Sequence, residues 1–172
     1  MNNTWDKLKE AKHFLEEMKR VSHDSDKFRY ELTAFLAASR SITQIMQKEF
    51  SEKPGFTSWY TQKQKDMENN PTLKYLHRQR SITFHERPVL SYPITITNQV
   101  TNSAGMRIIL TGTGSSVSLA SVYFPPPVIQ PTTTVKYFFD DIPNDEKDVI
   151  TICQEAINAL EAIVTECKDN LG

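Results

Sequence analysis

The sequence has no long apolar run and few cysteines. A membrane-spanning helix needs about 18 or more apolar residues in a row, and none is present. Residues 1–20 are polar and lack the apolar core of a secretion signal, so we expect a cytoplasmic protein that does not enter a membrane. The 2 cysteines, Cys153 and Cys167, fall in one predicted helix, where about 21 Å separates them. That distance excludes a disulfide between them and predicts two reduced, buried thiols.

The motifs of several common enzyme sites are also missing. No two histidines have the His-Glu-x-x-His spacing of a zinc site, and we expect neither a metal nor a cofactor. No Gly-x-Ser-x-Gly elbow occurs, and neither cysteine has a nearby histidine. The glycine-rich "TGTGSS" lacks the lysine and the following helix of a phosphate loop, so it predicts a hairpin turn. These absences exclude the best-known phosphate, zinc and serine-hydrolase sites.

Composition and charge indicate one folded domain. The 172 residues are 38% hydrophobic and 24% charged, which is typical of globular proteins. A chain of this length buries about 70% of its unfolded surface and needs no disulfide or metal. The formal net charge of −1 argues against a protein that coats nucleic acid with its whole surface, but it allows a local basic patch.

Apolar residues at three- and four-residue steps predict four helices in the first half of the chain. The first covers about 3–21, the second runs from Phe28 to Phe50, and the third begins near Phe56. The fourth begins at Pro71 with Asn70 as its cap, because proline favours the first helical position and asparagine the position before it.

The period changes after Pro88. The segments "YPITIT", "GMRIILTG", "VSLASVYF" and "TTVKYFFD" predict three or four short antiparallel strands, separated by Gly105, the Gly112–Ser116 turn and the prolines 125–127. A last helix then follows, with Asn144 or Asp145 as its cap and acidic residues in its first turn. A sustained apolar stripe marks this helix as part of the core.

Together these patterns predict an α+β fold that is mainly helical. We expect a single domain over residues 1–172, in which 1–88 and 143–172 form a helical bundle. Residues 89–142 would form a small antiparallel β insertion between the fourth helix and the C-terminal helix. The C-terminal helix should pack back onto the first two.

Positive charge is concentrated in "KYLHRQRSITFHERP", residues 74–88. Four cations against one carboxylate give this segment a formal charge of +3: Lys74, Arg78, Arg80 and Arg87 against Glu86. Arg80 and His85 are the candidate catalytic pair. A histidine titrates near neutrality and can exchange a proton with a ribose hydroxyl, while an arginine fork can hold a phosphate and stabilise the charge that develops on it. One cation and one imidazole suffice for RNA cleavage without a metal.

The hexapeptide "RSITFH" resembles the Arg-x4–6-His motif of HEPN domains, and the helical blocks suit their fold. The resemblance implies a helical bundle and a metal-independent ribonuclease of a toxin–antitoxin or defence system, with Arg80 and His85 of two protomers meeting in a homodimer cleft. RNA and an antitoxin-like protein are the partners it implies. The strand block has no counterpart in the resemblance, and Ser81 stands where the family commonly has asparagine.

Helix geometry leaves more than one assignment open. Arg78 and His85 lie within about 20° of each other around a helix, whereas Arg80 and His85 are about 140° apart. On one ideal helix Arg78 is therefore the better partner for His85, whereas Arg80 joins a stripe that faces a packed neighbour or a second subunit. Because a site across a dimer axis can use both arginines, we assign catalysis to Arg80 and His85. Contacts with phosphate or RNA are assigned to the residues Arg78, Ser81, His77 and Arg40. Alternatively, Arg80 is a core arginine paired with an acid such as Glu31.

Aromatic residues offer two further sites. Trp59 and Tyr60 can stack on a base, although aromatic residues at helical spacing are more often part of a core. Tyr92, Tyr123 and Tyr137 can form an exposed interaction surface on the sheet, or the strands can simply cover the end of the bundle. Two functions follow: a homodimeric, metal-independent endoribonuclease, or a non-catalytic helical module that binds a protein or a nucleotide and dimerises.

Overall fold

The computed structural model describes residues 3–102, 107–113, 116–123, 128–141 and 147–171. Within them the fold is mainly helical, with five helices, and its strands lie between the fourth helix and the C-terminal one. The predicted α+β, mainly helical fold class is therefore confirmed. The chain divides into two compact units, Met1–Ile94 with Val135–Gly172, and Thr95–Thr134. The first unit holds all five helices and the adjoining ends of the strand block.

Two long helices open the first unit. α1 covers Asn3–Arg20 and α2 covers Ser25–Phe50, close to the predicted bounds. The α2 cap is Asp24, whose carboxylate accepts a hydrogen bond from the Lys27 backbone N–H at 3.1 Å. The first backbone N–H groups of a helix have no partner within the helix, and this bond satisfies one of them. The cap therefore favours a helix that begins at this position.

The next two helices begin where the glycine, asparagine and proline residues of the sequence predicted. α3 covers Phe56–Asn69 after Gly55, whose φ of 83° suits glycine because it has no Cβ to clash. α4 covers Pro71–His85, and the Asn70 side chain accepts a hydrogen bond from the Leu73 N–H at 3.0 Å. The predicted Asn70 cap with Pro71 at the first turn is confirmed.

The C-terminal helix begins later than the sequence predicted. α5 covers Val149–Leu171, and its first turn holds no acidic residue, so the expected acidic first turn is wrong. The carboxylate of Asp148 accepts hydrogen bonds from the backbone N–H of Thr151 at 2.9 Å and from its hydroxyl at 3.2 Å. Asp148 therefore caps α5 and stands just before it. The expected caps Asn144 and Asp145 lie outside the described residues.

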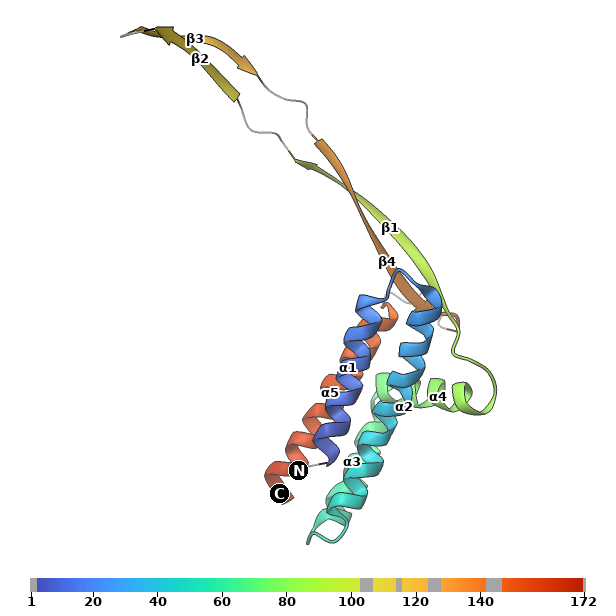
Figure 1. Cartoon of the computed structure of the whole chain (residues 1–172). Helices are drawn as coiled ribbons and strands as arrows, with labels where there is room; N and C mark the ends of the chain where they lie inside the picture. Colours follow the sequence, from blue (N-terminus) through green and yellow to red (C-terminus); the bar gives the residue numbers. More distant parts are fainter. Residues whose placement is uncertain (1–2, 103–106, 114–115, 124–127, 142–146, 172) are drawn as a thin grey trace. The chain divides into compact units, whose positions relative to one another are not determined.

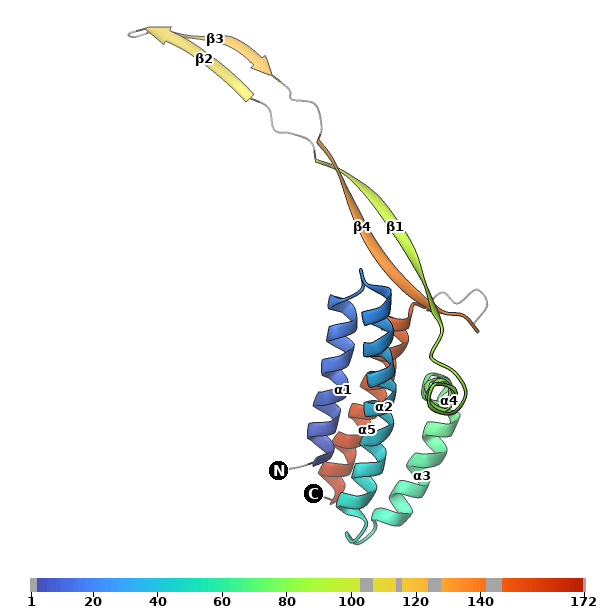
Figure 2. The ribbon, with the colours of Figure 1, turned by 45° about the vertical axis from the view of Figure 1, so that its right-hand side comes forward.

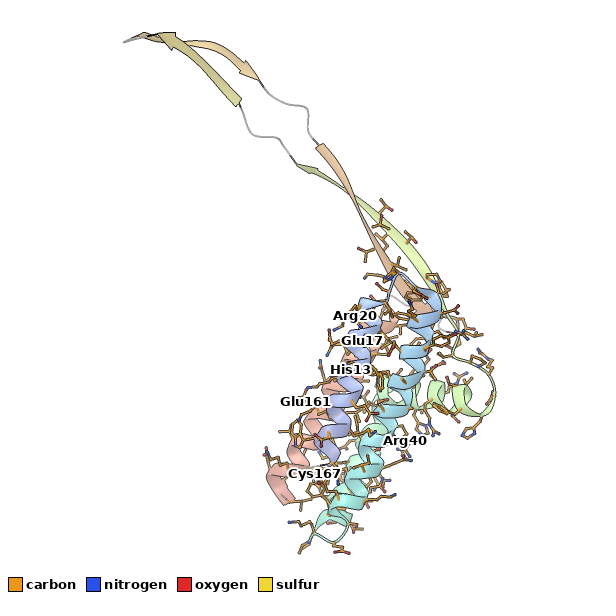
Figure 3. All side chains as sticks on the ribbon, viewed as in Figure 1. His13, Glu17, Arg20, Arg40, Glu161 and Cys167 are labelled. Atoms are coloured by element: carbon orange, nitrogen blue, oxygen red, sulfur yellow. The ribbon has the colours of Figure 1, made fainter. Side chains whose placement is uncertain are left out.

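α1, α2 and α5 run side by side, and α3 and α4 lie on the other side of α2 from α1 (Figures 1 and 2). As predicted, α5 contacts both α1 and α2. A salt bridge between Lys12 and Glu161 at 2.6 Å joins α1 to α5 at their surface, where Figure 3 labels Glu161. The core between these helices is formed by apolar residues less than about 6% exposed, led by Phe28, Phe35, Leu8, Leu15, Leu32, Ile42, Met46 and Ile157.

Three or four strands were expected, and the described residues contain four, which form two two-stranded sheets. β1 (Ser91–Asn102) pairs with β4 (Val128–Phe139), and β2 (Arg107–Thr113) pairs with β3 (Ser116–Tyr123). The β2–β3 pair is antiparallel, from Arg107 opposite Tyr123 to Thr113 opposite Ser116, with a bulge between Ile109 and Leu110. The expected turn residues Gly105, Gly114 and 125–127 lie outside the described residues.

The end of β4 belongs to the helical core. Tyr137 is 3% exposed, and its ring stacks on Phe28 of α2 at 3.7 Å between centroids. The Tyr137 hydroxyl donates to Ser25 Oγ at 3.2 Å. The expected exposure of Tyr137 is therefore wrong, because α2 covers this face of the strand. Tyr92 is exposed as expected, and the side chain of Tyr123 lies outside the described ones.

Both cysteines lie in α5, are buried and form no disulfide. Burial raises the pKa of the Cys167 thiol to about 11, and burial likewise raises the pKa of Cys153. Two reduced, buried thiols were expected, and this arrangement agrees with that expectation. No helix in the described part of the chain is long and apolar enough to cross a membrane.

One surface cluster makes stability depend on pH. Glu166 of α5 accepts hydrogen bonds from Lys63 Nζ at 2.8 Å and from the Trp59 indole N–H at 2.9 Å, and both bonds hold its pKa below the usual range. A lowered carboxylate pKa stabilises the fold above the unfolded pKa of about 4.3, and this stability is lost as pH falls through the folded value. The Glu166 side chain is 41% exposed, so the contribution is below about 1 kcal/mol.

We therefore expect Glu166→Gln to lose less stability than the parent protein between pH 7 and pH 3. The glutamine oxygen still accepts from Trp59, but the charge that titrates is gone. Thermal melts at pH 7, 5, 4 and 3 measure the effect, with Glu52→Gln in the exposed loop before α3 as the control. Melting temperatures that fall in parallel for parent and Glu166→Gln would show that this carboxylate does not contribute.

Candidate functional site

A pocket of about 500 Å³ opens between α2, α3 and α4, with α5 at its base. It lies wholly in the first compact unit. Apolar residues form much of its wall: Leu36, Met67, Leu73, Leu76, Ala156 and Leu160. The volume is within the range of small-molecule sites, about 300–1,000 Å³.

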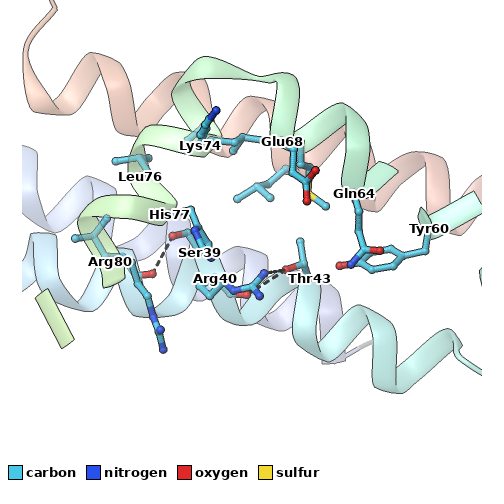
Figure 4. A pocket seen from close by; sticks show the side chains of 15 residues that line it. Ser39, Arg40, Thr43, Tyr60, Gln64, Glu68, Lys74, Leu76, His77 and Arg80 are labelled. Atoms are coloured by element: carbon cyan, nitrogen blue, oxygen red, sulfur yellow. Dashed lines mark hydrogen bonds between the residues drawn. The ribbon is translucent and has the colours of Figure 1, made fainter. Parts of the chain in front are cut away.

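Basic side chains from α2 and α4 line this pocket, and Lys74 and Arg80 extend in opposite directions (Figure 4). Arg40 comes from α2, and Lys74, His77 and Arg80 come from α4 at steps of three residues, each about 60° around the helix from the one before. Arg40 Nη1 donates to Thr43 Oγ1 at 3.2 Å. Within the described residues, none of the three permanent cations has an ion pair, although the chain has acids to spare.

Arg80 is the least satisfied of these groups. Its guanidinium lies over the ring of Phe84, 5.0 Å from the centroid, and its Nε is buried without a hydrogen-bond partner in the described structure. A buried donor without a partner costs about 1–3 kcal/mol, more for a charged group. The predicted alternative, a core Arg80 paired with Glu31, is wrong, since the described residues give Arg80 no ion pair at all.

Polar residues of α3 line the other side. Tyr60, Gln64 and Glu68 follow at steps of four residues and therefore share one face of α3. The Tyr60 hydroxyl accepts a hydrogen bond from Gln47 Nε2 at 2.8 Å. Glu68 is exposed, is the one carboxylate among the lining residues, and has no hydrogen bond or ion pair within the described part of the chain.

A polar network holds α4 in place. Asp141, just after β4, accepts from the Tyr75 hydroxyl at 2.6 Å and from Gln79 Nε2 at 2.7 Å, and Gln79 also donates to the Tyr75 oxygen at 2.9 Å. Gln79 is 3% exposed, so both of its amide hydrogens are satisfied inside the protein. Burial raises the pKa of Tyr75 well above its usual value, and the bond to Asp141 raises it further. The network fixes the helix that carries three of the four basic side chains of the pocket.

The structure brings some predicted site residues together and leaves others outside. Arg40, His77 and Arg80 line the pocket, whereas Ser81 and His85 do not. His85 is the exposed last residue of α4, and the turn of about 140° between positions 80 and 85 places it on another face. The catalytic roles of Arg80 and His85, and the RNA contact assigned to Ser81, stay predictions.

Arg78 points away from the pocket as well. Its side chain is 68% exposed, and its Nη2 lies 4.0 Å from Asp141 Oδ2. Trp59 is outside the pocket lining too, with its indole bonded to Glu166, while Tyr60 stacks on Phe56 at 5.3 Å. Tyr60 is buried and Trp59 is partly buried, which agrees with the interpretation of both residues as part of the core.

The sequence analysis counted Lys74 in the basic segment but did not assign it to a site, and it did not name Gln64 or Glu68. The spacing 74, 77, 80 on α4 and the spacing 60, 64, 68 on α3 are the signals that could have found them. Neither signal shows that the two faces meet, because the turn at Asn70 decides the angle between the helices. Among the described residues, no three histidines, cysteines or acids lie where they could hold a metal ion.

Comparison with known families gives one result. Residues 2–84 match the family model described as bacteriophage lambda protein ea47. The match covers slightly less than half of the chain, from α1 to the penultimate residue of α4. It therefore includes Arg40, Lys74, His77 and Arg80, and it stops before His85. No curated protein and no solved structure matches the chain.

This match corrects the resemblance to HEPN domains. The helices that carried the resemblance match the ea47 family model, and no HEPN family matches them. An arginine and a histidine five residues apart are too few positions to identify a family, because helices contain such pairs by chance. The HEPN assignment is wrong, and what it implied about a shared dimer cleft loses its support.

Proposed function

We propose that this protein is a binding module that holds a phosphate-bearing ligand in the pocket between α2, α3 and α4. The observation that carries the proposal is the set of Arg40, Lys74 and Arg80 around one pocket, without ion pairs in the described residues. The proposal develops the second predicted function, a non-catalytic helical module.

The energetics support an anionic ligand. Arg40 and Arg80 are half-buried, and a cation removed from water without a partner is costly. An anion in the pocket would remove that cost and would gain charge-assisted hydrogen bonds. Arginine suits phosphate in particular, because its planar fork matches two phosphate oxygens.

The test is the affinity of the purified protein for phosphate-bearing probes. Isothermal titration with inorganic phosphate, pyrophosphate and nucleoside monophosphates should show binding that weakens as salt rises. We expect Arg80→Ala and Arg40→Ala each to lower the affinity about 10- to 100-fold, since a hydrogen bond to a charged group is worth about 1.5–3 kcal/mol.

Arg78→Ala is the matched control, because Arg78 has the same charge and the same helix but lies outside the pocket. It should change the affinity less than about twofold. Thermal melts of all three variants confirm that each remains folded. The proposal fails if no probe binds, or if Arg78→Ala weakens binding as much as Arg80→Ala does.

RNA cleavage without a metal is the second candidate function. The observation that motivates it is the formal charge of +3 in residues 74–88, the segment that carries both Arg80 and the exposed His85. Two copies of the chain would have to bring these groups together, so the candidate also requires a homodimer. It supposes His85 as the general base or acid and Arg80 as the group that stabilises the phosphoryl charge.

In this case the protein should cleave single-stranded RNA in EDTA, and His85→Ala should reduce the rate by about 100-fold or more, as expected for the loss of a general acid or base. His23→Ala, an exposed loop histidine, is the control. Light scattering of the same samples measures the oligomeric state. RNA that stays intact would reject this candidate and leave the binding proposal standing.

A further inference from the structure

We infer that the ligand of this pocket is a nucleoside monophosphate whose base presents two adjacent N–H donors, as guanine does. The inference rests on the proposed function and adds the part of the ligand that the cations do not address. It follows from the two unlike sides of the pocket.

The pocket has a cationic arm and a neutral-to-acidic arm that meet near the α3–α4 junction. Lys74, His77 and Arg80 follow one another along α4 away from Asn70, while Glu68, Gln64 and Tyr60 follow one another along α3 in the opposite chain direction. Figure 4 shows Arg80 at one end of the pocket and Tyr60 with Gln64 at the other. A ligand that fills both ends would meet cationic side chains at one end and neutral ones at the other.

Glu68, which lies between Lys74 and Gln64 in Figure 4 and is exposed, determines what the pocket can hold beside Gln64. A carboxylate accepts hydrogen bonds and donates none, and Glu68 has no partner among the described residues. A phosphate there would be repelled, whereas two parallel N–H donors would satisfy both carboxylate oxygens. Guanine offers such an edge in its N1–H and its exocyclic amine, whereas adenine offers one donor beside an acceptor.

The remaining lining suits a flat base and a sugar. Met67, Leu73 and Leu76 supply an apolar wall against which a ring can pack, and the amide of Gln64 can donate or accept beside Glu68. A volume of about 500 Å³ accommodates one nucleotide. We therefore place the phosphate at Arg40 and Arg80 and the base at Glu68 and Gln64.

The test compares GMP, IMP, AMP and CMP by isothermal titration on the full chain. GMP should bind about 10- to 100-fold more tightly than AMP, because a single bidentate contact can favour the correct base over another by this factor. IMP, which keeps N1–H but lacks the amine, should be intermediate. Glu68→Gln should lower the affinity for GMP to about that for AMP and leave the affinity for AMP unchanged. Arg80→Ala should lower the affinity for all four nucleotides equally.

Glu52→Gln, an exposed glutamate before α3, is the control and should change nothing. Four equal affinities that Glu68→Gln does not alter, or a preference for AMP or CMP, would overturn this inference while the proposed function stands. Absence of binding by all four together with inorganic phosphate and pyrophosphate would overturn the proposed function itself. The two failures are thus distinguishable in one set of titrations.

Discussion

Replacing Phe28 with alanine is expected to lower the free energy of unfolding by about 3–5 kcal/mol, as for other buried phenylalanines. Phe28 is 0% exposed in the first turn of α2, and its ring stacks on Tyr137 at 3.7 Å and 11° between planes. The variant leaves a cavity between α2 and β4, and it removes the surface on which Tyr137 rests. Tyr137 would then expose its ring, so the loss includes two aromatic side chains.

Urea unfolding followed by circular dichroism measures this change. The control is Tyr30→Ala, two residues further along the same helix, where the residue is 60% exposed. Exposed sites of this kind change stability by less than about 0.5 kcal/mol. A loss below about 1 kcal/mol for Phe28→Ala would mean that the packing of α2 against the end of β4 contributes little to the fold.

Asp141→Ala is expected to lower the free energy of unfolding by about 2–3 kcal/mol. The variant removes the acceptor of Gln79 Nε2 and of the Tyr75 hydroxyl, and Gln79 is too deeply buried to find water in its place. A buried donor left without a partner costs about 1–3 kcal/mol. The Asp141 side chain is 19% exposed, so water offsets part of the loss at Tyr75.

The same variant should also weaken ligand binding, because α4 carries Lys74, His77 and Arg80. Asp140→Ala is the matched control, since Asp140 lies next in the chain but makes only a loose contact with Arg87 at 3.9 Å. It should change stability by less than about 0.5 kcal/mol. If the two variants unfold alike, the network does not hold α4, and the position of the cationic side chains must depend on apolar packing alone.

Most of the secondary structure could be predicted from the sequence because its signals are local. The 3.6-residue period of apolar residues marks α1 and α2, and the Asn70 side chain with Pro71 marks the start of α4. α5 was placed correctly, but its first residue was not. Asp148 caps it rather than an earlier residue, and the choice among several acids in a row depends on which one meets the backbone of Thr151.

The site could be predicted only in part. A short basic stretch drew attention to Arg80 and His77, and both line the pocket. The same stretch suggested a family from two residues, whereas residues 2–84 match the model of a different family. A pair of residues carries less information than a pattern over four helices.

The sequence by itself determined where the helices and strands lie, that the fold is mainly helical, and that positive charge gathers on α4. Those properties depend on neighbours within a few positions along the chain. Only the tertiary structure decided that Tyr137 is buried against Phe28, that His85 stays outside the pocket, and that Glu68 and Arg80 line the same one. These outcomes depend on how helices pack and on the angle at the α3–α4 turn, and no local pattern in the chain encodes either.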